Sequence, residues 1–382
     1  MLSLAGSSAG APAGERRIHA LDTLRGTASI VVVFWHYQYF FGVRPFGAAL
    51  MPAYTNGQLA VDVFFVISGF ILANVYGGRI RSRADFLSFV VKRIARLYPL
   101  HLATLAATAL VFAAFWHQQG TYAYFYKGND SYHLLLNLSL LQAMGLEKDF
   151  SFNAPSWSIS TEFWVNMLFG VLVLLGALRS SLAALLLAVI SAGMIVTYSP
   201  QWTTGHLFFG WLVLPVVRTI SGFFVGVLVH WLWQRHKAPQ NASLAMFWLG
   251  LGGMLALMMI RPDHPASTHL GVVLTFVCAP LLVYACATSV ALNRAGASGI
   301  GQWLGAISYS LYLWHFPLAA VFALLGIDKL WPNPELCAML YLCALAIVAT
   351  ASHRLIELPA REWVLRVALP PARRSRTSQL PS

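Results

Sequence analysis

Residues 24–42 read LRGTASIVVVFWHYQYFFG, and this stretch indicates both the environment of the chain and the position of its reactive groups. A helix of this length rises about 28 Å, close to the roughly 30 Å of hydrocarbon in a bilayer. Apolar and aromatic side chains fill its centre, while Arg25 stands near its start and His36 in its second half. The stretch therefore predicts a helix that crosses a membrane and carries two ionisable groups into it.

The composition of the whole chain indicates the same environment throughout. Of 382 residues, 58% are hydrophobic and only 10% are charged, whereas a soluble domain carries about 25% charged residues. The mean hydropathy is +0.66, and a transmembrane β-barrel would instead show alternating segments of about ten residues. We therefore predict an all-α fold, a polytopic integral membrane helical bundle. About ten transmembrane helices are expected, at 24–42, 58–77, 98–116, 158–178, 181–198, 206–233, 243–260, 269–291, 303–326 and 336–357.

The basic residues gather in a few loops and tails, and their distribution predicts the orientation. The clusters are Arg16–Arg17, Arg79–Arg83, Lys92–Arg96, Arg235–Lys237 and Arg373–Arg376. Cytoplasmic loops of membrane proteins are enriched in lysine and arginine. Placing both termini in the cytoplasm puts nearly all of these clusters on that side, so we predict an N-in, C-in topology. The same distribution explains the net charge of +12 without a nucleic-acid partner, because no basic stripe is interleaved with aromatic residues.

The remaining organisation is simple. Residues 1–18 are predicted to form a cytoplasmic tail without a cleavable signal peptide, residues 19–366 the membrane domain, and residues 367–382 a disordered basic tail. Glycine pairs such as Gly301/Gly305 predict close packing between helices. The four cysteines lie in apolar stretches without a CxxC pattern, so we expect buried thiols and no metal site.

Ionisable side chains inside the predicted spans are the candidate functional residues, because a charge in hydrocarbon is costly. They are Asp22, Arg25, His36, Asp62, Glu162, Arg218 and His315. Arg25 and His36 are separated by three helical turns plus about 20°, so they share one face and lie about 16 Å apart along the axis. In the predicted orientation His36, Asp62, Glu162 and His315 all fall in the outer half of the membrane. These positions predict one polar pocket lined by histidine and carboxylates.

Such a pocket suits the transfer of a group to a hydroxyl. A hydroxyl is a poor nucleophile near neutral pH and needs a base, for which histidine is the usual choice. A donor that carries several phosphates needs fixed cations at the aqueous edge, and arginine binds them with two parallel hydrogen bonds. The run Lys92–Pro99, KRIARLYP, offers such cations on the predicted cytoplasmic side.

Other roles are open for each of these residues. A membrane histidine can be a packing residue that forms a hydrogen bond, and Lys92, Arg93 and Arg96 can simply determine topology. Asp62 and Glu162 each lie near the start of a predicted helix, where a carboxylate can cap the chain. Charge placement alone leaves an enzyme and a secondary transporter about equally favoured.

Six stretches in a fixed order distinguish these alternatives. They are LDTLRG at 21–26 leading to His36, VDVFFVISGF at 61–70, Arg93 and Arg96 followed by YPL at 98–100, PSWSISTE at 155–162, ISYSLYLWHFP at 307–317, and SHRLIELP at 352–359. Together they resemble the motifs of the acyltransferase-3 family of bacterial membrane acyltransferases, which includes enzymes that O-acetylate polysaccharides. The resemblance extends from residue 21 to residue 359.

The resemblance implies a membrane O-acyltransferase of the bacterial inner membrane, with ten core helices and cytoplasmic acyl-CoA, by default acetyl-CoA, as donor. It implies catalytic roles for His36 and Arg25, and donor binding by Arg93 and Arg96. We further predict that Glu162 and His315 orient the reacting groups or relay protons, and that Tyr98 and Arg25 also bind the donor. The residues predicted to support the pocket are Asp22, Asp62, Ser68, Trp157, Arg218, Tyr309 and Glu357.

The acceptor implied is a hydroxyl of a carbohydrate or a glycoside-like molecule. The rival function is a secondary transporter or exporter of an acylated or anionic small molecule. Transporters of this kind usually contain two related halves, and this sequence shows no such internal repeat.

Overall fold

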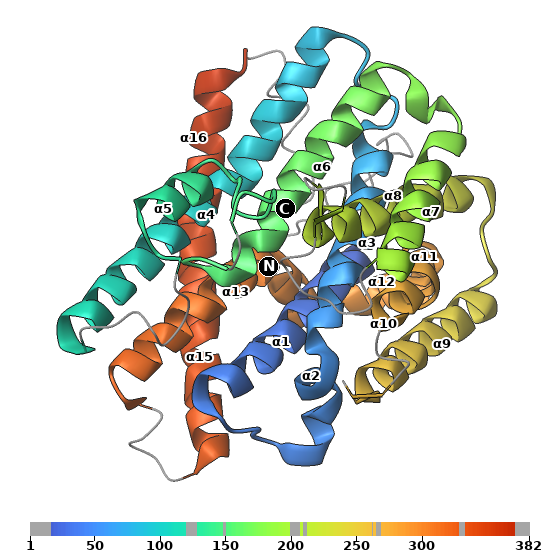
Figure 1. The fold of residues 1–382 in the computed structure, drawn as a ribbon. Helices are drawn as coiled ribbons and strands as arrows, with labels where there is room; N and C mark the ends of the chain where they lie inside the picture. The colour runs from blue at the N-terminus through green and yellow to red at the C-terminus, as the bar shows by residue number, and fades with distance from the viewer. Residues whose placement is uncertain are drawn as a thin grey trace, which may run out of the picture.

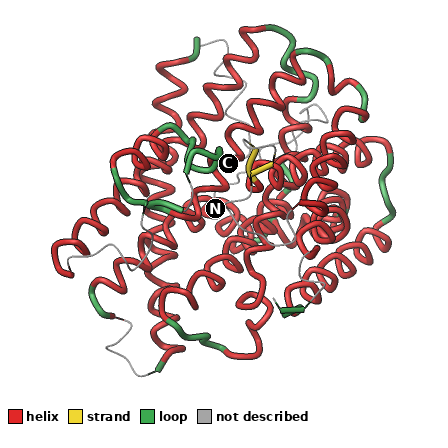
Figure 2. Tube along the Cα trace, viewed as in Figure 1, coloured by secondary structure: helices red, strands yellow, loops and turns green. Residues whose placement is uncertain are grey.

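The structure is a computed structural model, and it describes residues 17–119, 128–147, 150–198, 207–208, 212–261, 263–264, 269–327 and 333–370. Most of the predicted N-terminal tail and the basic group Arg373–Arg376 lie outside these described residues. The described chain is built almost wholly of helices, as Figure 2 shows by colour. The all-α membrane class predicted from composition is therefore confirmed.

Each of the ten predicted spans overlaps a helix or a short series of helices, although the helix within the span predicted at 206–233 begins only at Leu214. These are α1 (His19–Phe41), α3 (Ala60–Tyr76), α4 (Arg83–Gln119), α6 (Trp157–Leu174), α7 (Leu182–Tyr198), α8 (Leu214–Arg235), α9 (Gln240–Met259), the series α10 (Leu270–Val273), η6 (Leu274–Cys278) and α11 (Ala279–Thr288), α13 (Gly299–Leu324), and the series α15 (Pro334–Ser352), η7 (His353–Glu357) and α16 (Leu358–Ala368). In the described part of the chain, 8 helices are long and apolar enough to cross a membrane. Neither α1, which carries Asp22 and Arg25, nor the 17-residue α7 is among them. The number of crossings and the N-in, C-in topology remain predictions.

Short elements connect the long helices. The segment between α1 and α3 forms η1 (Gly47–Leu50), α2 (Met51–Asn56) and η2 (Gly57–Leu59), and the segment between α4 and α6 contains α5 (Ser131–Leu138) and η3 (Ala154–Ser156). Before α7 lies η4 (Ala177–Arg179), and before α13 lies α12 (Val290–Gly296). The strands β1 (Leu207–Phe208) and β2 (Leu212–Val213) pair antiparallel, with Leu207 opposite Val213.

Helices α1 and α13 lie side by side and run in the same direction, because Arg25 and Ser29 contact Ser308 while His36 contacts His315. Glycine permits this approach: a Cβ atom on Gly305 would lie 2.6 Å from the Cβ of Asp22 and 3.0 Å from its backbone carbonyl carbon. The close packing predicted from the glycine pairs is confirmed here. It brings the ionisable face of α1 against a second polar helix.

Two segments of the described chain are π-helical, and each of them ends shortly before a proline. The π-helices η6 and η7 end two residues before Pro280 and Pro359, respectively. A proline has no N–H to donate to the carbonyl four residues earlier, and its ring clashes with that carbonyl, so a local i→i+5 pattern relieves the conflict. In η7 this turn carries Glu357. Beyond it, α16 continues the line of α15 and packs beside α4 (Figure 1).

Candidate active site

His36 on α1 and His315 on α13 form a contact pair inside the bundle. His315 Nε2 lies 3.2 Å from His36 Nδ1, and the ring centroids are 4.8 Å apart. His315 is buried and His36 is partly buried. The structure thus brings together two residues that the sequence placed at similar depth on different helices.

The backbone around the pair determines which nitrogens carry protons. His315 Nδ1 lies 2.5 Å from the carbonyl oxygen of Tyr312, which can only accept, so a neutral His315 carries its proton on Nδ1. Its bare Nε2 then accepts from His36 Nδ1, which also lies 3.0 Å from the Val32 carbonyl. Two acceptors therefore hold the His36 proton on Nδ1. Among the described residues His36 Nε2 has no hydrogen-bond partner, so its lone pair can take a proton or attack a carbonyl carbon.

A pocket lies among α1, α3, α4, α6, α13 and α16. Its lining on α3 runs from Phe64 to Tyr76, which spans about 18 Å along the helix. The Tyr76 end is cationic, since Arg93 stands over the Tyr76 ring. The cations that line the pocket are Arg25, Lys92, Arg93, Arg96 and Arg361.

At its other end the pocket is lined by aromatic rings close to the histidine pair. Phe64 and Tyr312 are in edge contact, with ring centroids 5.5 Å apart. On α13 the lining residues are Ser308, Tyr309 and Tyr312. His315 follows Tyr312 by one helical turn, about 4.5 Å along the axis. The Tyr312 ring centroid lies 5.8 Å from that of His315, so a ring of the pocket lining adjoins the histidine pair.

Arg93 has an incompletely satisfied guanidinium at the cationic end. Its Nε is buried and has no hydrogen-bond partner among the described residues, and the same holds for the hydroxyl of Tyr76. The guanidinium carbon lies 5.7 Å from the Tyr76 ring centroid and 6.0 Å from that of Phe89. Buried polar groups are rarely left unsatisfied. Two such groups at one end of a pocket are consistent with a polar ligand that binds there.

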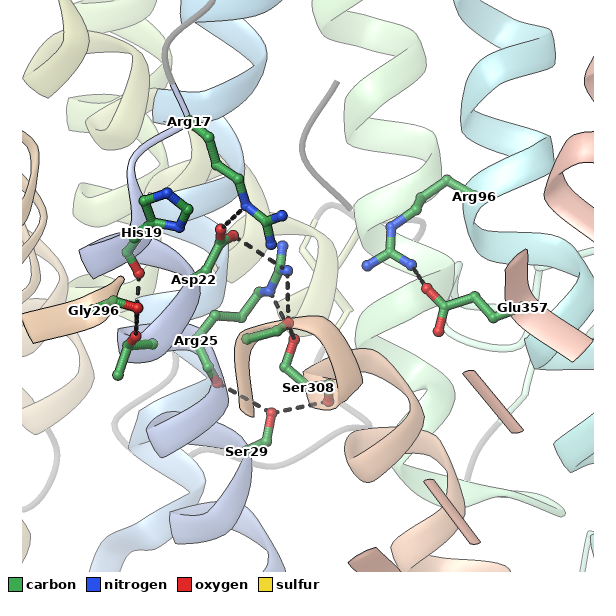
Figure 3. A network of polar contacts seen from close by, with 11 residues as sticks. Arg17, His19, Asp22, Arg25, Ser29, Arg96, Gly296, Ser308 and Glu357 are labelled. Carbon is green, nitrogen blue, oxygen red and sulfur yellow. Dashed lines mark hydrogen bonds and ion pairs between the residues drawn. The ribbon is translucent and has the colours of Figure 1, made fainter. Parts of the chain in front are cut away.

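Arg96 is engaged differently, although it lies one turn away on the same helix. Its guanidinium forms an ion pair with Glu357 (Figure 3) and lies 4.8 Å from the Tyr309 ring centroid. The other carboxylate oxygen of Glu357 accepts a hydrogen bond from Ser310 at 3.0 Å and lies 3.0 Å from His353 Nδ1. The two arginines of the motif therefore have different environments, one unsatisfied and one paired.

Arg25 faces the pocket from α1 and is fixed to α13. Its Nε donates to Ser308 Oγ at 2.9 Å and its Nη2 to the Gly305 carbonyl at 3.2 Å. Asp22 lies 3.6 Å from the guanidinium and also accepts from Arg17 at 2.7 Å, as Figure 3 shows. This chain of contacts holds a positive charge in the pocket wall while limiting its movement.

Glu162 lines the pocket from α6, and its Oε1 accepts a hydrogen bond from Ser68 Oγ on α3 at 2.7 Å. This contact joins two motif residues. Helix α6 begins at Trp157, five residues before Glu162, and its N-cap has no side-chain hydrogen bond among the described residues, so Glu162 does not fill the capping role that the sequence left open. Between Glu162 and the histidine end, Ser158 Oγ lies 2.8 Å from the Tyr312 hydroxyl.

Asp62 and Arg218 form a closed ion pair outside the pocket lining. Arg218 donates from Nε and Nη2 to both oxygens of Asp62, at 2.7 and 2.8 Å, and from Nη2 to the Gln58 carbonyl. The ring of Trp157 lies over the guanidinium, 5.5 Å from centroid to carbon. The sequence predicted that these three residues support the pocket; the structure places them in a sealed cluster that joins α3, α6 and α8.

The structure also places Tyr98 outside the pocket lining, as it does the Asp62, Arg218 and Trp157 cluster, and it adds lining residues that the sequence did not indicate. Tyr98, predicted to help bind the donor, donates instead to the Leu138 carbonyl at the end of α5. Arg361 and Tyr312 were not singled out, although both line the pocket. Tyr312 precedes His315 by three residues and therefore shares its helix face. Arg361 and Leu365, four residues apart on α16, likewise indicate one inward face.

Comparison with known proteins identifies the family of the chain. The family model described as an acyltransferase domain matches residues 18–353. The chain belongs to the acyltransferase-3 family. It is 27% identical over 379 residues to the acyltransferase MdmB of Streptomyces mycarofaciens, covering 90% of this chain and 91% of that protein. No solved structure gives a match.

Two further relatives are named for glycan-related processes. The exopolysaccharide production protein ExoZ of Rhizobium meliloti is 25% identical over 288 residues, 72% of this chain and 80% of ExoZ. The peptidoglycan O-acetyltransferase OatA of Listeria monocytogenes is 21% identical over 382 residues, 91% of this chain but only 56% of OatA. The protein is an acyltransferase with multiple membrane helices, and family membership decides against the transporter.

Proposed function

We propose that this acyltransferase moves an acyl group, acetyl by default, from cytoplasmic acyl-CoA to a hydroxyl of a carbohydrate or glycoside-like acceptor, in the inner membrane of a bacterium. One observation supports this most directly: a pocket with cations at one end is lined at the other by Tyr312, whose ring lies 5.8 Å from that of His315 in the histidine pair. The glycan-related names of ExoZ and OatA support a carbohydrate acceptor.

The donor enters with its phosphates at the cationic end. Arg93, Lys92 and Arg361 bind them, and the buried Arg93 Nε gains the partner that it lacks. The pantetheine arm extends along α3 past Ser68 and brings the thioester towards Phe64 and Tyr312. This path carries the reactive end of an anionic molecule into the membrane interior while the anion stays at the aqueous edge.

His36 then acts as the general base. Its Nε2 takes the proton of the acceptor hydroxyl, whose oxygen forms a bond to the thioester carbonyl carbon. When the C–S bond breaks, the CoA thiolate recovers that proton from His36. His315 keeps the His36 proton on Nδ1 and so keeps Nε2 available. An acyl-histidine route needs the same free Nε2, and rapid quenching of the reaction distinguishes the two routes.

The decisive test measures binding of CoA and turnover of radiolabelled acetyl-CoA by purified protein with glycan acceptors. His36→Ala should lower turnover by at least about 100-fold, in the range of general-base catalysis, with CoA affinity unchanged. His315→Ala should also lower turnover, by a smaller factor, and should leave CoA affinity unchanged. Arg93→Ala should weaken CoA binding about 10- to 100-fold, the value of a charge-assisted hydrogen bond.

Matched controls come from exposed residues on α4. His117→Ala and Arg83→Ala remove the same side chains at positions far from the pocket lining and should match the wild type. Wild-type turnover in His36→Ala would reject its catalytic role. A well-folded wild-type protein that binds no acyl-CoA would reject the donor.

A further inference from the structure

We propose that Phe64 and Tyr312 form a wall that limits the donor to a short acyl chain. The inference rests on the proposed function, because it takes acyl-CoA as the molecule in the pocket. It adds the residues that decide which acyl group is accepted.

The wall is built from two rings of different mobility. Tyr312 is 5% exposed, and its hydroxyl lies 2.8 Å from Ser158 Oγ and 3.0 Å from the Pro155 carbonyl oxygen. The hydroxyl end of this side chain is therefore fixed by two contacts. Phe64 has no polar anchor, is only partly buried, and stands edge-on against Tyr312 at 76° between ring planes. Changes at Phe64 can alter the space at the wall while the Tyr312 anchor stays in place.

Tyr312 also connects the wall to the base. Its side chain lines the pocket, and its backbone carbonyl accepts from the Nδ1 of His315, which in turn contacts His36. The thioester must approach this end for His36 to act on the transfer. The acyl group extends beyond the thioester carbonyl, so it occupies the space against the two rings. A methyl group fits where a longer chain meets Phe64 or Tyr312.

The experiment compares kcat/KM for acetyl-CoA, propionyl-CoA and butyryl-CoA. The wild type should prefer acetyl over butyryl by at least about tenfold, because a pocket discriminates about 10- to 200-fold per excess or missing methylene. Phe64→Ala, and Phe64→Leu as a milder change, should shift the butyryl/acetyl ratio upward by about tenfold or more.

Phe70→Leu is the matched control. It makes the same substitution on the same helix, but Phe70 packs against His230 and Trp233 of α8, with ring centroids 5.5 Å from each, and does not line the pocket. Its butyryl/acetyl ratio should equal that of the wild type.

Three outcomes would overturn the proposal. If the wild type has the same kcat/KM for butyryl-CoA and for acetyl-CoA, the two rings do not limit the acyl chain. An unchanged ratio in both Phe64 variants, with turnover retained, removes the wall but leaves the donor assignment intact. A wild type that binds no acyl-CoA of any length removes the donor assignment, and the wall with it.

Discussion

The ion pairs Asp62–Arg218 and Arg96–Glu357 have the same chemistry but different surroundings. Both are well buried, with side-chain exposures of 0% and 8% in the first pair and 3% and 11% for the carboxylate and arginine of the second. Arg218 is satisfied by both oxygens of Asp62 and by the Gln58 carbonyl, and it does not line the pocket. Arg96 lines the pocket and shares Glu357 with Ser310 and His353.

The difference shows that a buried charge in a membrane helix does not by itself indicate chemistry. The Asp62–Arg218 pair ties α3 to α8 at a buried point outside the pocket lining. The Arg96–Glu357 pair ties α4 to η7 in the wall of a cavity. We infer a structural role for the first and a positioning role for the second, and the variants below separate these roles.

The largest effect is expected at Asp62. Asp62→Ala leaves the Arg218 charge buried without its partner, which costs about 3–5 kcal/mol, and most of the protein should fail to fold. Thermal unfolding and size-exclusion chromatography of detergent-solubilised protein measure the loss. The double variant Asp62→Ala/Arg218→Met removes the stranded charge and should recover much of the folded fraction. A single variant with wild-type stability would contradict the structural role.

A smaller effect is expected at Glu357, where substitution should lower turnover and leave stability nearly unchanged. Glu357→Gln keeps a hydrogen-bond acceptor beside Arg96, and the cavity gives the arginine access to water, so the unfolding temperature should change little. Turnover of acetyl-CoA should fall about 10- to 100-fold because the pocket wall shifts. CoA affinity should stay equal to that of the wild type or increase, since a negative charge has been removed from a site for phosphates. Weakened CoA binding without loss of turnover would contradict the positioning role.

Much of this arrangement could be predicted from the sequence. Apolar length located each of the ten helical regions, and the shared face of Arg25 and His36 indicated where α1 carries its polar contacts. The structure shows that face packed along α13, with Arg25 on Ser308 and His36 on His315. Spacing along one helix gives such results because the turn of an α-helix is regular.

Partners between helices could not be predicted in the same way. Spacing gives the face of a residue but not the helix that packs on that face, so Asp62, Arg218 and Glu162 were grouped in one pocket. In the structure Arg218 closes on Asp62, while Glu162 pairs with Ser68. The π-turn that carries Glu357 adds a second obstacle, because it rotates the following residues out of the 3.6-residue register.

The smallest effect, a modest loss of CoA affinity, is expected at Arg361. This arginine belongs to neither of the two ion pairs compared above. Arg361 lines the pocket from α16 beside the cations of α4, but it is partly exposed, so solvent and salt weaken its attraction for phosphate. Arg361→Ala should weaken CoA binding only about 3- to 10-fold, and the effect should shrink as salt is raised.

The control for Arg361 lies on the same helix. Arg366 pairs with Glu362 on the surface, at side-chain exposures of 71% and 63%, and such exposed pairs contribute little. Arg366→Ala should leave CoA affinity unchanged. Equal losses of affinity in both variants would mean that α16 acts through its overall charge, whereas a loss confined to Arg361→Ala, with unchanged unfolding temperature, would assign the effect to one guanidinium in the pocket wall.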